Sequence, residues 1–393
     1  MSGLQRLIRF FAANALFASG LGFHAFLYNF YLEGLGHSPV EMGRAAATWS
    51  FGGLLVLLPV GRSVDKWGPK PVIVLAAVLA GMGLAWGAFA TSTLPIYLAS
   101  ALAGAAGVSW RVAQAPVLME LSTAQNRSRL FTLDAALLVA AGAGATAMSG
   151  AFVERIASGW HMGRTSALSI TLVIGALLTA ASAFAYSTLE LSPKTAGANA
   201  PATGTSVIPS TAILLIALTG LWLAGLTLAS PFFNLYFAHT FHLPIARVSW
   251  IFSAATVTTA ILLTGAGEVA TRIGARPALV IWLALFAPAM WGLALAPTVG
   301  LAAACYLMQS IVSPAANPLL DQLLLESVPP ERRGVVSSWR QAMASAGQVL
   351  AQSLGGVVLA ATSFTALFAV AGGLGLAAGC AVAIVAWRLG RTQ

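Results

Sequence analysis

The chain has 393 residues, of which 58% are hydrophobic and only 8% are charged. Soluble domains carry roughly 25% charged residues, so this composition excludes a surface that faces water throughout. A mean hydropathy of +0.85 and apolar runs long enough to cross lipid predict a membrane protein. The net charge of +9 does not indicate nucleic-acid binding, because the sequence has no basic stripe with interleaved aromatic residues. Cys305 and Cys380 lie in apolar runs and predict neither a disulfide framework nor a zinc site.

The apolar runs predict twelve membrane-spanning helices. Only helices or closed barrels satisfy the backbone in lipid, and the period-two alternation of barrel strands is missing from the sequence. The first run follows Arg6 and Arg9 and extends to about Tyr31, which is longer than a signal peptide requires. The spans are expected at residues 5–33, 41–62, 71–91, 94–119, 128–154, 165–187, 211–239, 246–267, 277–296, 298–321, 334–358 and 362–388.

Lysine and arginine are concentrated in the terminal segments and in the loops after even-numbered spans. The opposite loops hold only Arg44, Arg155, Arg164 and Arg247. By the positive-inside rule, both termini are expected in the cytoplasm.

The sequence divides into two similar halves. Residues 190–210 are rich in proline and small polar residues and predict a cytoplasmic linker between residues 1–189 and residues 211–393. Several anchors recur at nearly constant spacing, and this pattern predicts a duplicated six-helix bundle with a central site, which is typical of two-bundle transporters. The anchors pair Asn29 and Tyr31 with Asn234 and Tyr236, then Gly61, Gly68 and Pro71 with Gly267, Gly274 and Pro277, and Gly150 with Gly355.

The loop after the second span, Gly61-Arg-Ser-Val-Asp65-Lys66-Trp-Gly68-Pro-Lys70, resembles the signature loop of the major facilitator superfamily. The second copy, Gly267 to Arg276, is similar but lacks the aspartate. The resemblance covers essentially the whole chain. It implies an all-α membrane protein with two pseudo-symmetric six-helix bundles, located as a multi-pass protein in the cytoplasmic membrane of a bacterium.

In that family, the loop is similar to a latch that holds the cytoplasmic side closed. Gly61 and Gly68 would allow helices to approach closely, and Asp65 could face a helix N-terminus. Alternatively, these charges only set the topology. The expected members of the gate are Gly61, Asp65, Lys66, Gly68 and Lys70 with their partner Glu120, Arg272 and Arg276 with their partners Asp321 and Glu326, and Arg340.

Arg111 and Gln114 in the fourth span resemble a family motif that is associated with proton-linked efflux proteins, although Ala115 replaces its usual glycine. Their spacing places them on one helix face, and an arginine in lipid faces a bundle interior or a water-filled cavity. The alternative is a structural arginine that pairs across helices. In the eleventh span, Gly347 and Gly355 have the spacing of the family's antiporter motif without its Gly-Pro, so tight packing of small residues is the preferred interpretation.

The resemblance implies a central cavity lined by spans one, four, seven and ten. Polar and aromatic residues at helical spacing on these spans predict a mostly apolar lining with a few amides, which suits an amphipathic solute. Hydrogen bonds between helices are an equally good explanation for any single amide. The predicted lining residues are Asn14, His24, Tyr28, Arg111, Gln114, Trp222, Asn234, Tyr236, Gln309, Ser313 and Asn317.

Proton coupling requires a titratable group that faces the cavity. Asp134 in the fifth span is the first candidate, and His24 is the second because histidine titrates near neutral pH. The alternative for Asp134 is a fixed ion pair with Arg111 or Arg340. His239 and His242 have no third ligand and are interpreted as interfacial side chains, so no metal or other cofactor is expected.

These features predict a secondary transporter that works by alternating access and couples the efflux of amphipathic small molecules to protons. An enzyme is not expected, because no nucleophile–base constellation and no phosphate loop is present. The first alternative is uptake of a sugar or another nutrient. The second is a receptor or a lipid-moving protein on the same fold. The expected partners are a small-molecule substrate, protons and membrane lipid, and the protein is expected to be a monomer that binds no nucleic acid.

Overall fold

The computed structural model describes residues 3–123, 125–191, 209–329 and 332–391, and all regular structure in these ranges is helical. Twelve helices are long and apolar enough to cross a membrane, which confirms the predicted all-α membrane fold. The elements are α1 (Gly3–Gly34), α2 (Pro39–Trp67), α3 (Pro69–Phe89), α4 (Thr93–Leu121), α5 (Arg127–Gly159), α6 (Arg164–Ser187), α7 (Ser210–Leu228), η1 (Ser230–Phe232), α8 (Phe233–Thr240), α9 (Ile245–Ile273), α10 (Ala275–Leu295), α11 (Val299–Glu326), α12 (Arg333–Ala361) and α13 (Phe364–Arg391).

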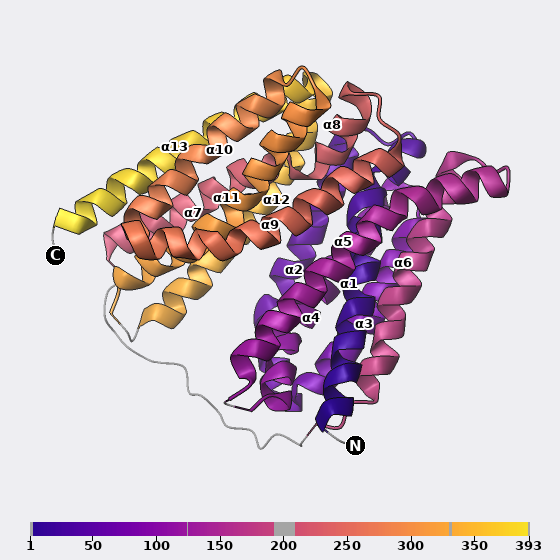
Figure 1. Cartoon of the computed structure of the whole chain (residues 1–393), viewed down its shortest axis with the longest axis horizontal. Helices are drawn as coiled ribbons and strands as arrows, with labels where there is room; N and C mark the ends of the chain where they lie inside the picture. The colour runs from indigo at the N-terminus through magenta and orange to yellow at the C-terminus, as the bar shows by residue number, and fades with distance from the viewer. Residues whose placement is uncertain (1–2, 124, 192–208, 330–331, 392–393) are drawn as a thin grey trace. The chain divides into compact units, whose positions relative to one another are not determined.

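The helices form two compact units (Figure 1). Unit 1 contains α1 to α6 together with residues 242–257, which include the first part of α9. Unit 2 contains α7, η1, α8, the rest of α9 and α10 to α13. Most of the predicted linker, residues 192–208, lies outside the described residues.

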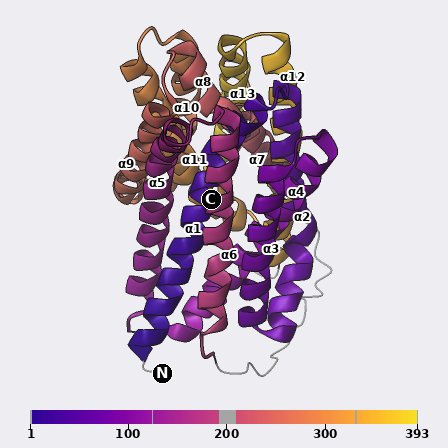
Figure 2. The same ribbon diagram turned by 90° about the vertical axis from the view of Figure 1, so that its right-hand side faces the viewer.

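Within unit 1, α1 packs against α5 and α6, α3 packs against α4 and α6, and α2 packs against α4. Figure 2 shows α1, α3 and α6 side by side. The core of this unit includes Phe10, Phe17, Ile73 and Tyr186, all of which are completely buried. Because the polar groups within this bundle are excluded from lipid and largely from water, each one needs a partner.

Within unit 2, α7 packs against α12 and α13, and α10 packs against α11 and α13. Trp222 of α7 is completely buried and meets the ring of Phe286 edge-on at 5.2 Å between centroids.

The seventh span differs from its prediction as one continuous helix. The helix ends at Leu228, and a 3₁₀ turn over Ser230–Phe232 precedes α8. Pro231 in this turn has no N–H to donate, and its ring clashes with the carbonyl four residues earlier in a regular helix. Pro231 favours the break, although Pro59, Pro116 and Pro288 lie inside continuous helices of the same chain.

Local sequence also sets the helix boundaries. Ser38 caps α2, its hydroxyl accepting from the backbone N–H of Glu41, while the Glu41 carboxylate accepts from the Ser38 backbone N–H at 2.8 Å. Gly68, between α2 and α3, has φ +80°, and Gly274, between α9 and α10, has φ +91°. Only glycine adopts these angles without strain, so both copies of the repeated loop need it at the same position.

Candidate functional site: two cavities

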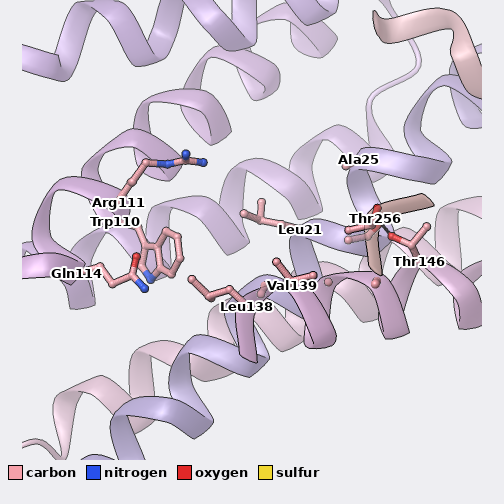
Figure 3. A pocket seen from close by; sticks show the side chains of 13 residues that line it. Leu21, Ala25, Trp110, Arg111, Gln114, Leu138, Val139, Thr146 and Thr256 are labelled. Carbon is pink, nitrogen blue, oxygen red and sulfur yellow. Dashed lines mark hydrogen bonds between the residues drawn. The ribbon is translucent and has the colours of Figure 1, made fainter. Parts of the chain in front are cut away.

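Unit 1 contains a cavity of about 410 Å³ between α1, α4, α5 and the first part of α9. Its walls are mostly aliphatic, and Leu21, Leu138 and Val139 form the centre in Figure 3. Arg111 and Gln114 lie at one end of the cavity, and Thr146 and Thr256 lie at the other (Figure 3). Such a chamber, apolar with a few polar groups, has the size and character of a small-molecule site.

A buried carboxylate is hydrogen-bonded to Gln114, one of the residues that line this cavity. Asp134 of α5 is 6% exposed. Its Oδ1 accepts from Asn14 Nδ2 of α1 at 2.5 Å, and its Oδ2 accepts from Gln114 Nε2 of α4 at 2.6 Å. Among the residues that the structure describes, no ion pair joins Asp134 to Arg111 or to Arg340. The carboxylate is therefore held by neutral amides.

The hydrogen bonds continue from Asp134 back to α4. The Tyr186 hydroxyl of α6 donates to Asn14 Oδ1, and Trp110 Nε1 of α4 donates to the Tyr186 oxygen at 2.8 Å. Both ends of this chain, Trp110 and Gln114, also line the cavity. We call these five residues (Asn14, Trp110, Gln114, Asp134 and Tyr186) the polar ring of unit 1.

Among the described residues, Arg111 is the only charged residue that lines the unit 1 cavity. Figure 3 shows its side chain and that of Gln114 leaving α4 in different directions. Within the described part of the chain, Arg111 has no acidic partner, so the cross-helix ion pair that was the alternative interpretation is not formed here. Its guanidinium group remains available to the cavity.

Unit 2 contains a second cavity, of about 530 Å³, between α7, α11 and α12. Here polar side chains dominate. Gln309, Ser313 and Asn317 of α11, which repeat every four residues, face it together with Asp321, Arg340, Gln341 and Gln348. Arg340 Nε lies 2.5 Å from Asp321 Oδ1, with the arginine side chain 10% exposed and the aspartate side chain 48% exposed.

Other predicted lining residues lie outside both cavities. His24 is 7% exposed, and its ring stacks on Tyr28 at 4.3 Å and faces Trp49 at 5.5 Å. The Tyr236 hydroxyl donates to the Leu293 carbonyl at 2.6 Å. Trp222 is completely buried, and Asn234 is 4% exposed. The assignment of these residues to a substrate path stays a prediction.

The predicted gate residues show a different pairing from the one expected. Arg272 contacts Glu268 on its own helix at 2.9 Å, and Asp321 contacts Arg340. Close helix packing at Gly61 is not present, because a Cβ added there would meet no atom within 4 Å of the described chain.

The first-half gate residues remain largely exposed. Asp65 and Lys66 are exposed, and the Lys66 ammonium lies 5.8 Å from the ring centre of Trp67. Lys70 is half-buried, and Glu120 lies near the end of α4. In the second half, Arg276 lies at the start of α10. Their role as a gate stays a prediction.

The sequence reasoning missed several cavity residues. Gln341 and Gln348 share one face of α12 at a spacing of seven, so the helical period contained a signal for them. Trp110 and Tyr186 carried no such signal, because an isolated aromatic residue in an apolar span is indistinguishable from core. Among the described residues, no group of three or more His, Cys, Asp or Glu could hold a metal ion.

The fold defines a multi-pass membrane protein. Residues 215–393 match the family model described as Major Facilitator Superfamily. The match lies in the second half of the chain, in agreement with the resemblance that the sequence predicts, and the solved structural neighbours share the fold.

One neighbour is the nucleoside transporter NupG, at 16% identity and a TM-score of 0.76 over 98% of this chain and 99% of that one. Another is a bacterial homologue of the iron transporter ferroportin, at 15% identity and a TM-score of 0.75 over 99% of both chains. At these identities, the likeness shows the fold alone. A curated relative, Monocarboxylate transporter 11 of Mus musculus, is 39% identical over 80 residues, which are 20% of this chain and 17% of the relative.

Proposed function

We propose that the chain is a secondary transporter that works by alternating access and couples the efflux of amphipathic small molecules to protons. The shared fold and the transporter names of the relatives support transport. The resemblance of Arg111 and Gln114 to an efflux motif supports the direction. The main observation in favour of proton coupling is the buried carboxylate of Asp134. It accepts a hydrogen bond from Gln114, which lines the unit 1 cavity.

Protonation of Asp134 would change its hydrogen bonds. An ionised carboxylate only accepts, and both oxygens now accept from an amide NH₂ group. A protonated carboxyl group carries an O–H that must donate, so one amide has to present its carbonyl oxygen instead. Gln114 lines the cavity, and turning its amide would alter the surface that a substrate meets. This links proton binding to substrate binding without an ion pair.

The lining of the unit 1 cavity limits which chemical classes of substrate it can bind. Its aliphatic walls favour a substrate with a large apolar part. Among the described residues that line this cavity, Arg111 carries the only charge, so its guanidinium group repels lipophilic cations and favours neutral or anionic amphipaths.

The test uses purified protein in liposomes with an imposed pH gradient and a trapped pH dye. Anionic, neutral and cationic amphipaths are added separately to the parent and to Asp134→Asn. We expect an anionic or neutral amphipath to drive proton movement in the parent and to lose that effect in Asp134→Asn, because asparagine cannot carry the proton.

Glu154→Gln is the matched control, since Glu154 is an exposed carboxylate on the same helix and lies outside this cavity. It should leave proton movement unchanged. Solute movement without proton movement in the parent would remove coupling and favour a facilitative carrier, whereas movement of no solute would favour a receptor.

A further inference from the structure

The turn between α1 and α2 holds His37 in a fixed position. Gly36, with φ +85°, follows the last turn of α1. The His37 backbone N–H donates to the Leu32 carbonyl at 3.0 Å, and the Gly36 N–H donates to the Glu33 carbonyl at 2.8 Å, which is the hydrogen-bond pair of a Schellman motif. The next residue, Ser38, caps α2. The backbone of His37 is therefore fixed on both sides, and its side chain is only 11% exposed.

Both ring nitrogens of His37 face oxygen atoms. Nδ1 lies 3.3 Å from Oε1 of Glu41 in the first turn of α2. Nε2 lies 3.1 Å from the carbonyl oxygen of Thr91, in the turn between α3 and α4. A carbonyl oxygen only accepts, so Nε2 needs a hydrogen to bond to it. The ring thus joins two turns that are more than 50 residues apart in the sequence.

The carboxylate of Glu41 is surrounded by donors. It accepts from the Ser38 backbone N–H at 2.8 Å, from the Ser38 hydroxyl at 3.0 Å and from the Thr93 hydroxyl at 2.9 Å. These donors favour the ionised form of the carboxylate, which only accepts. Nδ1 of His37 therefore needs a hydrogen as well. A neutral imidazole carries one N–H and an imidazolium carries two, so only the charged ring satisfies both contacts.

Further ionisable groups lie at this end of unit 1, on the helices around the turn: Glu33 of α1, Arg44 of α2, Tyr97 of α4 and Arg164 of α6. Tyr97 interacts electrostatically with both Arg44 and Glu41. Among the described residues, Glu41 is the carboxylate within ion-pair distance of the His37 ring. Glu41 is therefore the group that balances a charge on this ring.

We propose that His37 is a pH-sensitive switch that joins the α1–α2 turn to the α3–α4 turn when its ring is protonated and releases Thr91 when the ring is neutral. The positive-inside rule predicts that these turns face the exterior, so the proton would come from water on that side. Histidine is the side chain whose ordinary titration range suits such a switch. The switch is separate from the proposed transport cycle and does not depend on it.

The sign of the pH dependence follows from the protonated form. A histidine in an unfolded chain ionises near pH 6.5, and the folded arrangement favours the charged ring. The stability that these contacts contribute is therefore fully present at pH 5.5, and it is lost as the pH rises and the ring loses its proton. At pH 8.5, a neutral ring leaves one of the two acceptors facing a nitrogen lone pair.

Thermal unfolding of the purified protein in detergent at pH 5.5 and pH 8.5 tests the switch. His37→Gln keeps a polar side chain that does not titrate. We expect the midpoint difference between the parent and His37→Gln to be larger at pH 5.5 than at pH 8.5 by about 2–4 °C, as for one hydrogen bond to a charged group in a domain of this size. A difference that does not change with pH would overturn the proposal.

His161→Asn is the control, because His161 is an exposed histidine in the turn between α5 and α6. Asparagine tolerates the φ of +49° at this position. The midpoint difference between the parent and His161→Asn should be the same at both pH values. An equal pH dependence for the two histidine variants would show that titration of any histidine suffices, and it would overturn the assignment to His37.

Glu41→Gln tests the partner. Glutamine keeps an acceptor for the cap of α2 but removes the negative charge. In the Glu41→Gln background, the pH-dependent effect of His37→Gln should therefore fall to less than half of its size in the parent. An effect of undiminished size would exclude the ion pair as its origin.

Hydrogen exchange locates the change. Backbone amides of residues 89–93 are compared between the parent and His37→Gln at the same pH, which cancels the intrinsic pH dependence of exchange. We expect about three- to tenfold slower exchange in the parent at pH 5.5, because the ring then holds the Thr91 carbonyl, and a smaller difference at pH 8.5. Equal rates in the two proteins at pH 5.5 would show that His37 does not join the two turns.

Discussion

At the residue scale, the polar ring of unit 1 explains why a carboxylate is stable inside a membrane bundle. Asn14, Gln114 and Asp134 each stood out in the sequence as polar residues in apolar spans. The sequence could not show that they contact one another, because they lie on three different helices. It also could not show that Tyr186 and Trp110 complete the chain of hydrogen bonds. Contacts between distant helices depend on rotation and depth, which hydropathy does not encode.

The hydrogen bonds of the polar ring predict that removing the Tyr186 hydroxyl group lowers the stability of the protein. Tyr186→Phe leaves Asn14 Oδ1 without its donor and Trp110 Nε1 without its acceptor. Both atoms are buried, so we expect a loss of about 1–3 kcal/mol in the free energy of unfolding. The midpoint of thermal unfolding in detergent should fall. Ser187→Ala, at the neighbouring exposed position, should have little effect, and equal midpoints for the two variants would contradict the role of the ring.

At the element scale, the repeated sequence anchors have matching structural roles. Tyr31 donates to the Ala90 carbonyl at the end of α3, and its counterpart Tyr236 donates to the Leu293 carbonyl near the end of α10. Gly68 and Gly274 both have positive φ. These two pairs agree with the predicted duplication, and the structural reason for their residue types appears only in the fold. In the seventh span, the apolar run gave no sign of the break near Pro231. Hydropathy reports how apolar a segment is, and it does not report whether the helix through it is continuous.

The glycines of α12 support the packing interpretation of the antiporter-like spacing. A Cβ added at Gly355 would collide with the Leu228 carbonyl oxygen of α7, and one added at Gly347 would collide with the Gly220 carbonyl oxygen. Small residues at these positions let α7 and α12 approach closely, as is common between membrane helices.

This contact predicts opposite outcomes for two alanine substitutions on one helix. Gly355→Ala should destabilise the protein by about 1–3 kcal/mol, because the Leu228 carbonyl is backbone and cannot move aside cheaply. Gly334→Ala should cause no loss, since nothing lies within 4 Å of the added Cβ and alanine favours helix. Chemical denaturation in mixed micelles measures both. A Gly355→Ala protein as stable as the parent would exclude the close approach of α7 and α12.

At the scale of the whole molecule, composition and span length were sufficient to predict a twelve-helix membrane protein, because lipid permits few alternatives. The chemistry of the cavities was less accessible. Arg340 and Asp321 were both assigned to a gate from their position along the chain, yet they meet in one polar cavity. Charge placement in loops follows a simple rule, whereas charge placement within a bundle depends on which helices are neighbours.

The loop charges predict how the whole chain is oriented in the membrane. The loop between α4 and α5 precedes Arg127 and Arg129, whereas the loop between α3 and α4 carries no lysine or arginine. The positive-inside rule therefore places the first loop in the cytoplasm and the second outside. Thr123 and Thr91 are exposed residues in these two loops, so a cysteine at either position would be accessible to a reagent.

The measurement uses a chain in which Cys305→Ser and Cys380→Ser remove the native thiols, combined with Thr91→Cys or Thr123→Cys. A membrane-impermeant maleimide is added to intact cells and, separately, to permeabilised ones. We expect Thr91→Cys to be labelled in intact cells and Thr123→Cys to be labelled only after permeabilisation. The reverse pattern would place both termini outside, because an even number of spans keeps them on one side, and it would reverse the side on which the signature loop could act as a gate.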